Sequence, residues 1–374
     1  MSNKLSLFED STAGQSDVQP SKLPRDLAIL ALGEIQGVGR VTAVKLFETT
    51  DITALFRASR DQVLWVASKA QIAAPDAFAD VFCEKRDEAL KCASETLEKY
   101  DRFGVKVIFD DDPLYPKALT SMADRPRWLI VRGNVELLNA DRLVTLVGTR
   151  KPTQTGLKLA ERVAKILVNH GFVIVSGLAE GIDAVAHREA VAARGQTIAV
   201  LGTGIFNDFP NATAPLRTPI INNGGALVTE FFDKEQYSKQ HFVQRNRIQA
   251  ALSPMTIPVE AAVPSGTLHT ITFAKRYRKV VIGVRWEDQA DTDLHAFLRD
   301  EGFEIVTIPA FDDPLLTSLG RSYDFAGFLQ KSHLERNNAI VGRIVSFARR
   351  LIISESLSRL DVERIIRCLQ EDAS

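Results

Sequence analysis

Short apolar runs, rich in β-branched residues, alternate with segments of helical spacing between residues 143 and 308. The runs are LVTLVG, FVIVSG, TIAVLG, ALVTEF, TIPVEA, VVIGV and EIVTI. Such continuous runs are typical of strands that are buried on both faces, and a parallel sheet with helices on each side is the arrangement that buries them. The sequence therefore predicts an α/β fold with a doubly wound, mostly parallel sheet.

The remainder of the chain predicts smaller units on either side of this sheet. Its start is polar and rich in Ser, Asp and Gln, which is typical of a flexible segment because little apolar surface can be buried. Helical spacing follows, then strand-like runs such as VKVIF between turn formers, and helical spacing returns near the C-terminus. The predicted units are a flexible leader (1–23), a small SAM-like helical domain (24–103), an extended Rossmann-like domain (104–310), and a linker with a small helical C-terminal domain (311–374).

A Gly37-Val38-Gly39 turn lies between two helical stretches over residues 33–48. This arrangement predicts a helix-hairpin-helix. Such hairpins offer backbone amides to DNA phosphate in some proteins and serve only in packing or protein contacts in others. The sequence leaves both roles open.

Charge and cysteine content limit the class of protein. Lysine and arginine number 46 against 47 aspartates and glutamates, so binding to a polyanion would depend on a local basic patch. Cys83, Cys92 and Cys368 are far apart and fit neither a disulfide framework nor a metal site, which favours a reducing compartment. No apolar run approaches the roughly 18 residues of a membrane span, and the polar start lacks the apolar core of a signal peptide. We expect a cytoplasmic protein with no metal and no membrane association.

The first predicted strand of the sheet ends in a Gly-Thr-Arg-Lys turn before a helix. Ligands of such sheets lie beyond the carboxyl ends of the strands. Gly148 would let the backbone approach a ligand, Thr149 and Thr153 offer hydroxyls, and the helix start offers free amides to an anion. Arg150 and Lys151 would supply positive charge to a phosphate. The competing interpretation is a solvated Arg-Lys pair; the strand-to-helix context favours the ligand site.

The second turn, SGLAEGIDAVAH, contains Ser176 and Gly177 and leads into a helix with Asp183 and His187. The last two residues are four apart and share a helix face, so an acid/base or metal pair is conceivable. Without a third ligand or a nucleophile, Asp183 is more simply a carboxylate at a helix N-terminus. We favour the structural role.

The third turn, GTGIFNDFP, begins a dinucleotide fingerprint with Gly202 and Gly204 but has Asn207 at the position of the third glycine. No acidic residue follows at the distance needed to bind a ribose. We expect no nicotinamide cofactor.

Farther along, KQHFVQRNRIQAALS places Arg245, Asn246 and Arg247 at the opening of a predicted helix. Two arginines there oppose the macrodipole, which an anionic ligand would explain. A surface salt bridge to Asp233 or Glu235 is the alternative. We expect these arginines in solvent-facing positions, so that their replacement would hardly change folding.

The last polar turn lies in VPSGTLHT and comprises Ser265, Gly266 and Thr267, again between a strand and a helix. It would lie on the same sheet edge as the other turns.

Six motifs follow one another along the chain: VGTRKPTQTG, SGLAEGIDAVAH, AVLGTG, GALVTEF, QRNRIQAALS and VEAAVPSGTL. Because of these motifs and their order, the chain resembles the DNA-processing-protein-A (DprA/Smf) family over about residues 110 to 285. The resemblance implies single-stranded DNA binding, protection of incoming DNA, loading of a RecA-type recombinase and homodimerisation. It also implies that DNA phosphates meet the first turn and the arginine-rich helix start. The residues carried over are Arg150, Lys151, Arg245 and Arg247, with Gly148, Ser176 and Gly177 shaping the pocket.

A small-molecule function is the main alternative, because related Rossmann-type proteins hydrolyse nucleotides or sense nucleotide-derived signals. Their enzyme motif is Pro-Gly-Gly-x-Gly-Thr-x-x-Glu. Here His269 and Thr270 stand where a carboxylate is needed, so we expect no enzymatic activity. A nucleotide sensor, in defence for example, stays open, since the same turns would hold a nucleotide phosphate.

Overall fold

The computed structural model describes residues 23–235 and 238–308. Its strands form one nine-stranded sheet in the order β1-β2-β6-β5-β4-β3-β7-β8-β9. The predicted apolar runs all became strands, which confirms the doubly wound α/β fold. The strands are β1 (Val105–Phe109), β2 (Trp128–Gly133), β3 (Leu143–Val147), β4 (Val173–Ser176), β5 (Thr197–Val200), β6 (Ala226–Thr229), β7 (Met255–Pro258), β8 (Val280–Trp286) and β9 (Glu304–Ile308).

The strands from β3 to β9 are parallel, and their order reverses between β3 and β7. From β3 the chain winds outward through β4, β5 and β6, then returns to β7 on the other side of β3 and continues outward through β8 and β9. The loops that follow β3 and β7 therefore diverge from a common point at the carboxyl edge of the sheet. Such a switch point is where doubly wound sheets bind their ligands.

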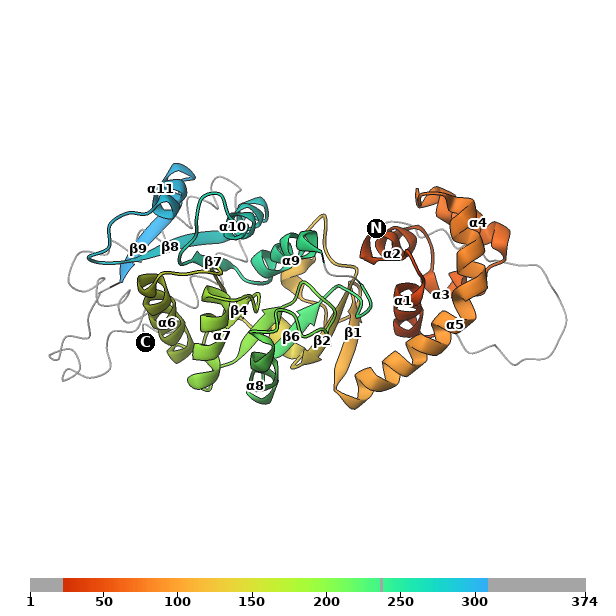
Figure 1. The fold of residues 1–374 in the computed structure, drawn as a ribbon, viewed down its shortest axis with the longest axis horizontal. Coiled ribbons are helices and arrows are strands. Elements are labelled where there is room, and N and C mark those ends of the chain that lie inside the picture. The colour runs from red at the N-terminus through yellow and green to blue at the C-terminus, as the bar shows by residue number, and fades with distance from the viewer. Residues whose placement is uncertain (1–22, 236–237, 309–374) are drawn as a thin grey trace.

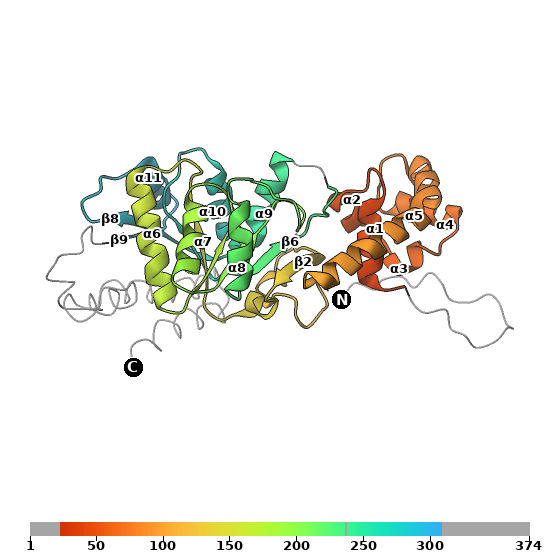
Figure 2. The same cartoon turned by 60° about the horizontal axis from the view of Figure 1, so that its bottom comes forward.

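Helices cover both faces of the parallel strands, as Figures 1 and 2 show. Successive side chains of β3 point to opposite faces of the sheet, so one strand contacts helices on both faces. Val144 packs with α6 and α7, whereas the hydroxyl of Thr145 donates to the Gln249 carbonyl of α9 at 2.8 Å. On the first face lie α6 (Gln154–Asn169), α7 (Ile182–Ala192) and α8 (Arg217–Asn222), and on the other lie α9 (Lys239–Leu252), α10 (Gly266–Arg276) and α11 (Asp293–Asp300).

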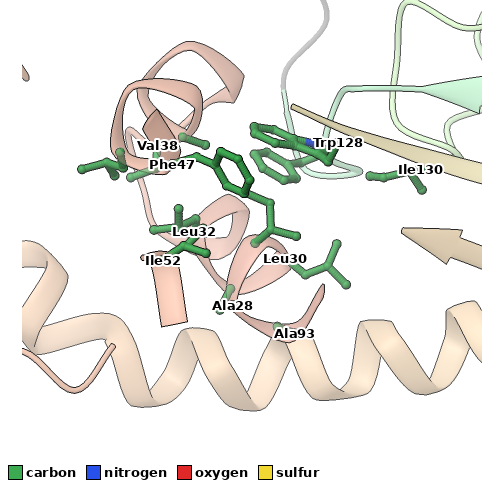
Figure 3. Packing of buried hydrophobic residues seen from close by; sticks show 14 of the residues in the cluster. Ala28, Leu30, Leu32, Val38, Phe47, Ile52, Ala93, Trp128 and Ile130 are labelled. Atoms are coloured by element: carbon green, nitrogen blue, oxygen red, sulfur yellow. The ribbon is translucent and has the colours of Figure 1, made fainter. Parts of the chain in front are cut away.

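The N-terminal part of the described chain is helical, as predicted. It comprises α1 (Arg25–Glu34), α2 (Arg40–Thr49), α3 (Ile52–Leu55), α4 (Arg60–Lys69) and the long α5 (Pro75–Arg102). Strands β1 and β2 join it to the sheet by antiparallel pairing. One hydrophobic cluster runs from these helices onto the sheet (Figure 3). At its centre Trp128 stacks on Phe232 with ring centroids 5.5 Å apart, and Phe47 lies 6.2 Å from Trp128.

The predicted hairpin between α1 and α2 faces the sheet domain. The first backbone amide of α2, at Arg40, donates to the Glu235 carboxylate at 3.2 Å, and the ring of Phe232 fills the space beside Gly33. Lys234 and Glu34 form an ion pair across the same contact. Of the two roles that the sequence left open for the hairpin, this structure favours packing. The Glu235 carboxylate already accepts from the Arg40 amide, which is therefore not free to donate to a DNA phosphate.

No helix in residues 23–235 and 238–308 is long and apolar enough to cross a membrane. The predicted leader and C-terminal helical domain lie outside the described residues, except for Leu23. The domain limits at residues 103, 104 and 310 stay predictions.

Candidate anion-binding site

A cavity of about 520 Å³ opens at the switch point, between the loops that follow β3 and β7. Helix α9 forms its third wall. Its volume suits a ligand of nucleotide size. Predicted site residues from three separate segments meet here: Gly148, Thr149, Arg150, Lys151, Arg245, Asn246, Ser265, Gly266 and Thr267.

The turn after β3 brings two exposed cations to the mouth of the cavity. The guanidinium of Arg150 lies 5.5 Å from the centroid of the Phe242 ring, and Lys151 is the next residue. Neither side chain forms an ion pair within residues 23–235 and 238–308. Their charges are therefore available to a ligand, and their use by a phosphate stays a prediction.

The predicted use of the α6 helix start by a ligand is wrong. The Glu260 carboxylate accepts from the Thr153 amide at 3.0 Å and from the Thr153 hydroxyl at 2.8 Å. The same hydroxyl caps the helix by accepting from the Gly156 amide at 3.0 Å. An internal anion thus already occupies the positive end of this helix.

Gly148 has a packing role in addition to its predicted place at the ligand site. A side chain on Gly148 would overlap the side chain of Ile182, at the start of α7. The glycine allows β3 and α7 to approach each other, and its backbone also lines the cavity, as predicted.

The start of α10 is the helix end that stays open to the cavity. Ser265 is its N-cap residue, yet its side chain makes no capping hydrogen bond, and its Oγ is buried without a partner. The space beside Gly266 is empty of protein atoms. Asn246 of α9 fixes this turn by donating to the Gly266 carbonyl at 3.3 Å. Unpaired donors at a helix N-terminus form a favourable environment for an anion.

Arg245 is not solvent-facing, contrary to the prediction. It is the seventh residue of α9 and only 3% exposed, and its Nη1 donates to the carbonyls of Gly177 and Val200, at the ends of β4 and β5. Burial lowers the pKa of its guanidinium to about 10, which the neighbouring Asp183 carboxylate partly opposes. Arg245 therefore joins two strand ends and forms part of the cavity wall.

Arg247 lies outside the cavity, and its prediction as a solvent-facing residue is also wrong. Its Nη2 donates to the Glu230 carboxylate at 2.7 Å, with both side chains buried. Arg40 of α2 lies 3.5 Å from the same carboxylate. Residues two apart on a helix do not share a face, so Arg245 and Arg247 point to different parts of the molecule. Arg247 therefore holds Glu230 within the sheet domain, and Arg40 makes the contact with Glu230 from the helical domain.

The segment after β4 contributes Ala179 and Asp183 to the cavity lining, whereas the predicted site residues Ser176 and Gly177 do not line the cavity. The Ser176 hydroxyl donates to the Leu146 carbonyl at 2.7 Å, and the Gly177 amide donates to Asp183 at 3.1 Å. His187 is fully buried and pairs with the Thr197 hydroxyl at 2.8 Å, and burial lowers its pKa to about 3. The structure thus supports the structural role favoured for Asp183 and His187.

Sequence reasoning missed the cavity-facing side of α9. Lys239, Phe242 and Gln249 line the cavity along with Asn246. Lys239 is exposed and has no ion pair among the described residues. Gln249 is buried, and its Nε2 has no hydrogen-bond partner. The spacing of three and four residues was visible in the sequence, but only the fold shows that this face meets the sheet edge.

Among the described residues, a switch-point cavity combines cations without ion pairs at its mouth with an open helix N-terminus, which in a Rossmann-type fold is a suitable site for a phosphate-bearing ligand. Comparison with known proteins narrows this class. The family model described as DNA recombination-mediator protein A matches residues 106–299, more than half of the 374 residues. The chain therefore belongs to the DNA recombination-mediator protein A family, which is the DprA/Smf family indicated by the sequence motifs.

Individual relatives agree with this assignment. The DNA processing protein DprA of Streptococcus pneumoniae is 36% identical over 216 residues, covering 57% of this chain and 73% of the relative. Protein Smf of Synechocystis is 29% identical over 298 residues, covering 78% and 72% respectively. The X-ray structure of the Streptococcus pneumoniae protein superimposes with a TM-score of 0.61 at 28% sequence identity, over 76% of this chain and 95% of that one.

Proposed function

We propose that this protein binds single-stranded DNA at the switch-point cavity and takes part in DNA processing. The observation that carries the proposal is the convergence of Arg150, Lys151 and Lys239, all exposed and without ion pairs among the described residues, on one cavity beside the open end of α10. Membership in a DNA recombination-mediator family supports DNA as the source of the phosphates.

The aromatic residues near the cavity support a single strand over a duplex. Phe242 lines the cavity and makes an edge-to-face contact with Phe209 at 5.7 Å, and the Phe209 side chain is 40% exposed. Exposed rings provide a surface for unpaired bases, whereas paired bases are inaccessible to them. Since cations, amides and rings read phosphates and base faces rather than base edges, we expect little sequence preference.

The proposal includes no catalysis and extends to partners. The family assignment supports transfer of the bound strand to a RecA-type recombinase in the cytoplasm by a homodimer. Three measurements test these parts: molar mass in solution, recombinase-dependent strand exchange with the protein present, and release of free base from a nucleoside monophosphate. A monomer, unchanged strand exchange or detectable base release would contradict the respective part.

A nucleotide sensor is the second candidate, because a cavity of about 520 Å³ with one open helix end also suits a free nucleotide. Competition separates the two. A nucleotide monophosphate that displaces a labelled oligothymidine only at far higher concentration supports DNA as the ligand, whereas tight nucleotide binding with weak oligonucleotide binding supports the sensor.

The central test is the replacement of Arg150 by Ala, measured by fluorescence anisotropy of a labelled oligothymidine at several salt concentrations. If Arg150 neutralises about one phosphate, the slope of log affinity against log salt should become shallower by about 0.7 for a single strand. Arg188→Ala is the matched control, because Arg188 is exposed on α7, outside the residues that line the cavity. Equal affinity and salt slope in Arg150→Ala and wild type would refute the assignment.

A further inference from the structure

A second cavity, of about 580 Å³, lies where the end of α5, strand β2 and the loop between β5 and α8 meet. Its walls combine cations with aromatic rings: Lys99 and Phe103 from α5 and its C-cap, Arg132 from β2, and Phe206 and Arg217 from the loop and α8. The predicted site includes none of these residues. The cavity also lies away from β3 and β7, so it is separate from the switch-point cavity.

The positive charge of this cavity is largely uncompensated. Lys99 and Arg132 form no ion pair within the described residues, and the Nε of Arg132 is buried without a hydrogen-bond partner. Arg217 donates to the carbonyls of Ile205 and Asn207 and so holds the loop in place. Among the lining residues Asp208 carries the one carboxylate, 3.9 Å from Arg217.

Aromatic rings lie directly under these cations. The Nζ of Lys99 is 3.9 Å from the centroid of the Phe206 ring, and the Arg132 guanidinium is 5.4 Å from Phe103 and 5.6 Å from Phe206. Phe103 packs edge-to-face on Phe206 but is 46% exposed. An exposed ring beside two cations that form no ion pair among the described residues suits a ligand that carries both a planar group and a negative charge.

One loop connects the two cavities. The segment after β5 places Phe209 against Phe242, which lines the switch-point cavity, and three residues earlier it places Phe206 in the second cavity. Gly202, at the start of this loop, packs against the Phe242 ring. A chain with a phosphate and a base at each unit could therefore follow the loop from one cavity to the other over the exposed face of Phe209.

We propose that the second cavity is a nucleotide subsite that extends the path of the single strand held at the switch point, with a base on Phe103 and a phosphate between Lys99 and Arg132. This inference rests on the proposed function, since it takes the same strand as the ligand. Bound DNA would then contact the helical domain as well as the sheet domain.

The test uses the full-length protein and a series of labelled oligothymidines, from the dinucleotide to lengths that span both cavities. Phe103→Ala and Arg132→Ala should each weaken binding of the long oligonucleotides by roughly 5-fold or more, which is the lower end of the effect of one base stack. Neither should affect the dinucleotide, which fills only the switch-point cavity. Arg150→Ala should weaken binding at every length.

Two control variants separate the subsite from general effects. Arg102 lies in the same last turn of α5 as Lys99 and is exposed, but it does not line the cavity, so Arg102→Ala tests the helix-end charge alone. Trp65 is 40% exposed on α4 and lies 5.7 Å from Lys69, so Trp65→Ala removes a comparable exposed ring elsewhere. Both should bind like wild type.

The outcomes distinguish this inference from the proposed function. If Arg150→Ala weakens binding while Phe103→Ala and Arg132→Ala behave like the controls at all lengths, the second subsite is refuted and the proposed function stands. A loss that is as large for the dinucleotide as for long oligonucleotides would also refute it, by showing a site independent of strand length. If the wild type binds no oligothymidine, both proposals fail.

Discussion

The Arg247–Glu230 pair gives the most demanding prediction for stability. Glu230 is 1% exposed, and its carboxylate lies 2.7 Å from Arg247 and 3.5 Å from Arg40. At an effective dielectric constant of about 20, the attraction at the shorter distance is roughly 6 kcal/mol, much of which offsets the cost of burying two charges. Breaking a buried pair costs about 3–5 kcal/mol. Because Arg40 remains, we expect Arg247→Met to lower the free energy of unfolding by about 3 kcal/mol.

The measurement is urea unfolding followed by circular dichroism, with Arg150→Ala as a control that should stay within about 0.5 kcal/mol of wild type. The double variant Arg247→Met with Glu230→Gln removes both charges of this pair and should recover part of the loss, because Arg40 then loses the same carboxylate. The folded Arg247→Met protein should retain the wild-type salt slope of DNA binding, because Arg247 lies outside the switch-point cavity. A loss below about 1 kcal/mol would refute the reasoning, since it would mean that Glu230 is not effectively buried.

Further predictions concern two glycines and one histidine. Gly177→Ala should destabilise the protein by about 1–3 kcal/mol, because a methyl group would overlap the guanidinium of Arg245. Gly266→Ala should be nearly neutral, because open space lies beside Gly266. Equal melting temperatures of the two variants would contradict this contrast. Burial lowers the pKa of His187 to about 3 from an ordinary value of 6.5. Between these two pH values, His187 is therefore protonated in the unfolded chain and neutral in the folded chain. The stability that depends on neutral His187 is fully present above pH 6.5. As the pH falls from 6.5 toward 3, the free energy of unfolding decreases by at most about 1.4 kcal/mol per pH unit. His187→Gln should show a shallower pH slope in urea unfolding, and an unchanged slope would show that His187 does not titrate differently in the two states.

Much of the fold was predictable because it depends on local pattern. The apolar runs predicted every strand from β3 to β9, since a strand buried on both faces needs continuous apolar residues. The parallel order then brings the turns after the strands to one edge. For this reason the sequence could place Arg150, Lys151 and the Ser265 turn together, although more than 100 residues separate them in the chain.

The orientation of helix α9 was not predictable in the same way. A helix turns by about 100° at each residue, so Arg245 and Arg247 diverge, and which of them meets the cavity depends on the face that packs on the sheet. In the folded chain Arg245 joins two strand ends, and Arg247 forms a buried ion pair with Glu230 inside the sheet domain. Helical periodicity alone gives the spacing of such residues but not their partners.

The sequence by itself determined the class of sheet and the polar turns at the carboxyl ends of its strands, because each of these follows from residues close in the chain. Only the tertiary structure decided which helix end is open to a ligand. Thr153 and Ser265 both begin helices at this edge, but Glu260 neutralises the first, and the Ser265 hydroxyl stays unpaired at the second. The difference arises from a carboxylate more than 100 residues from Thr153, and only the folded chain brings that charge to the helix end.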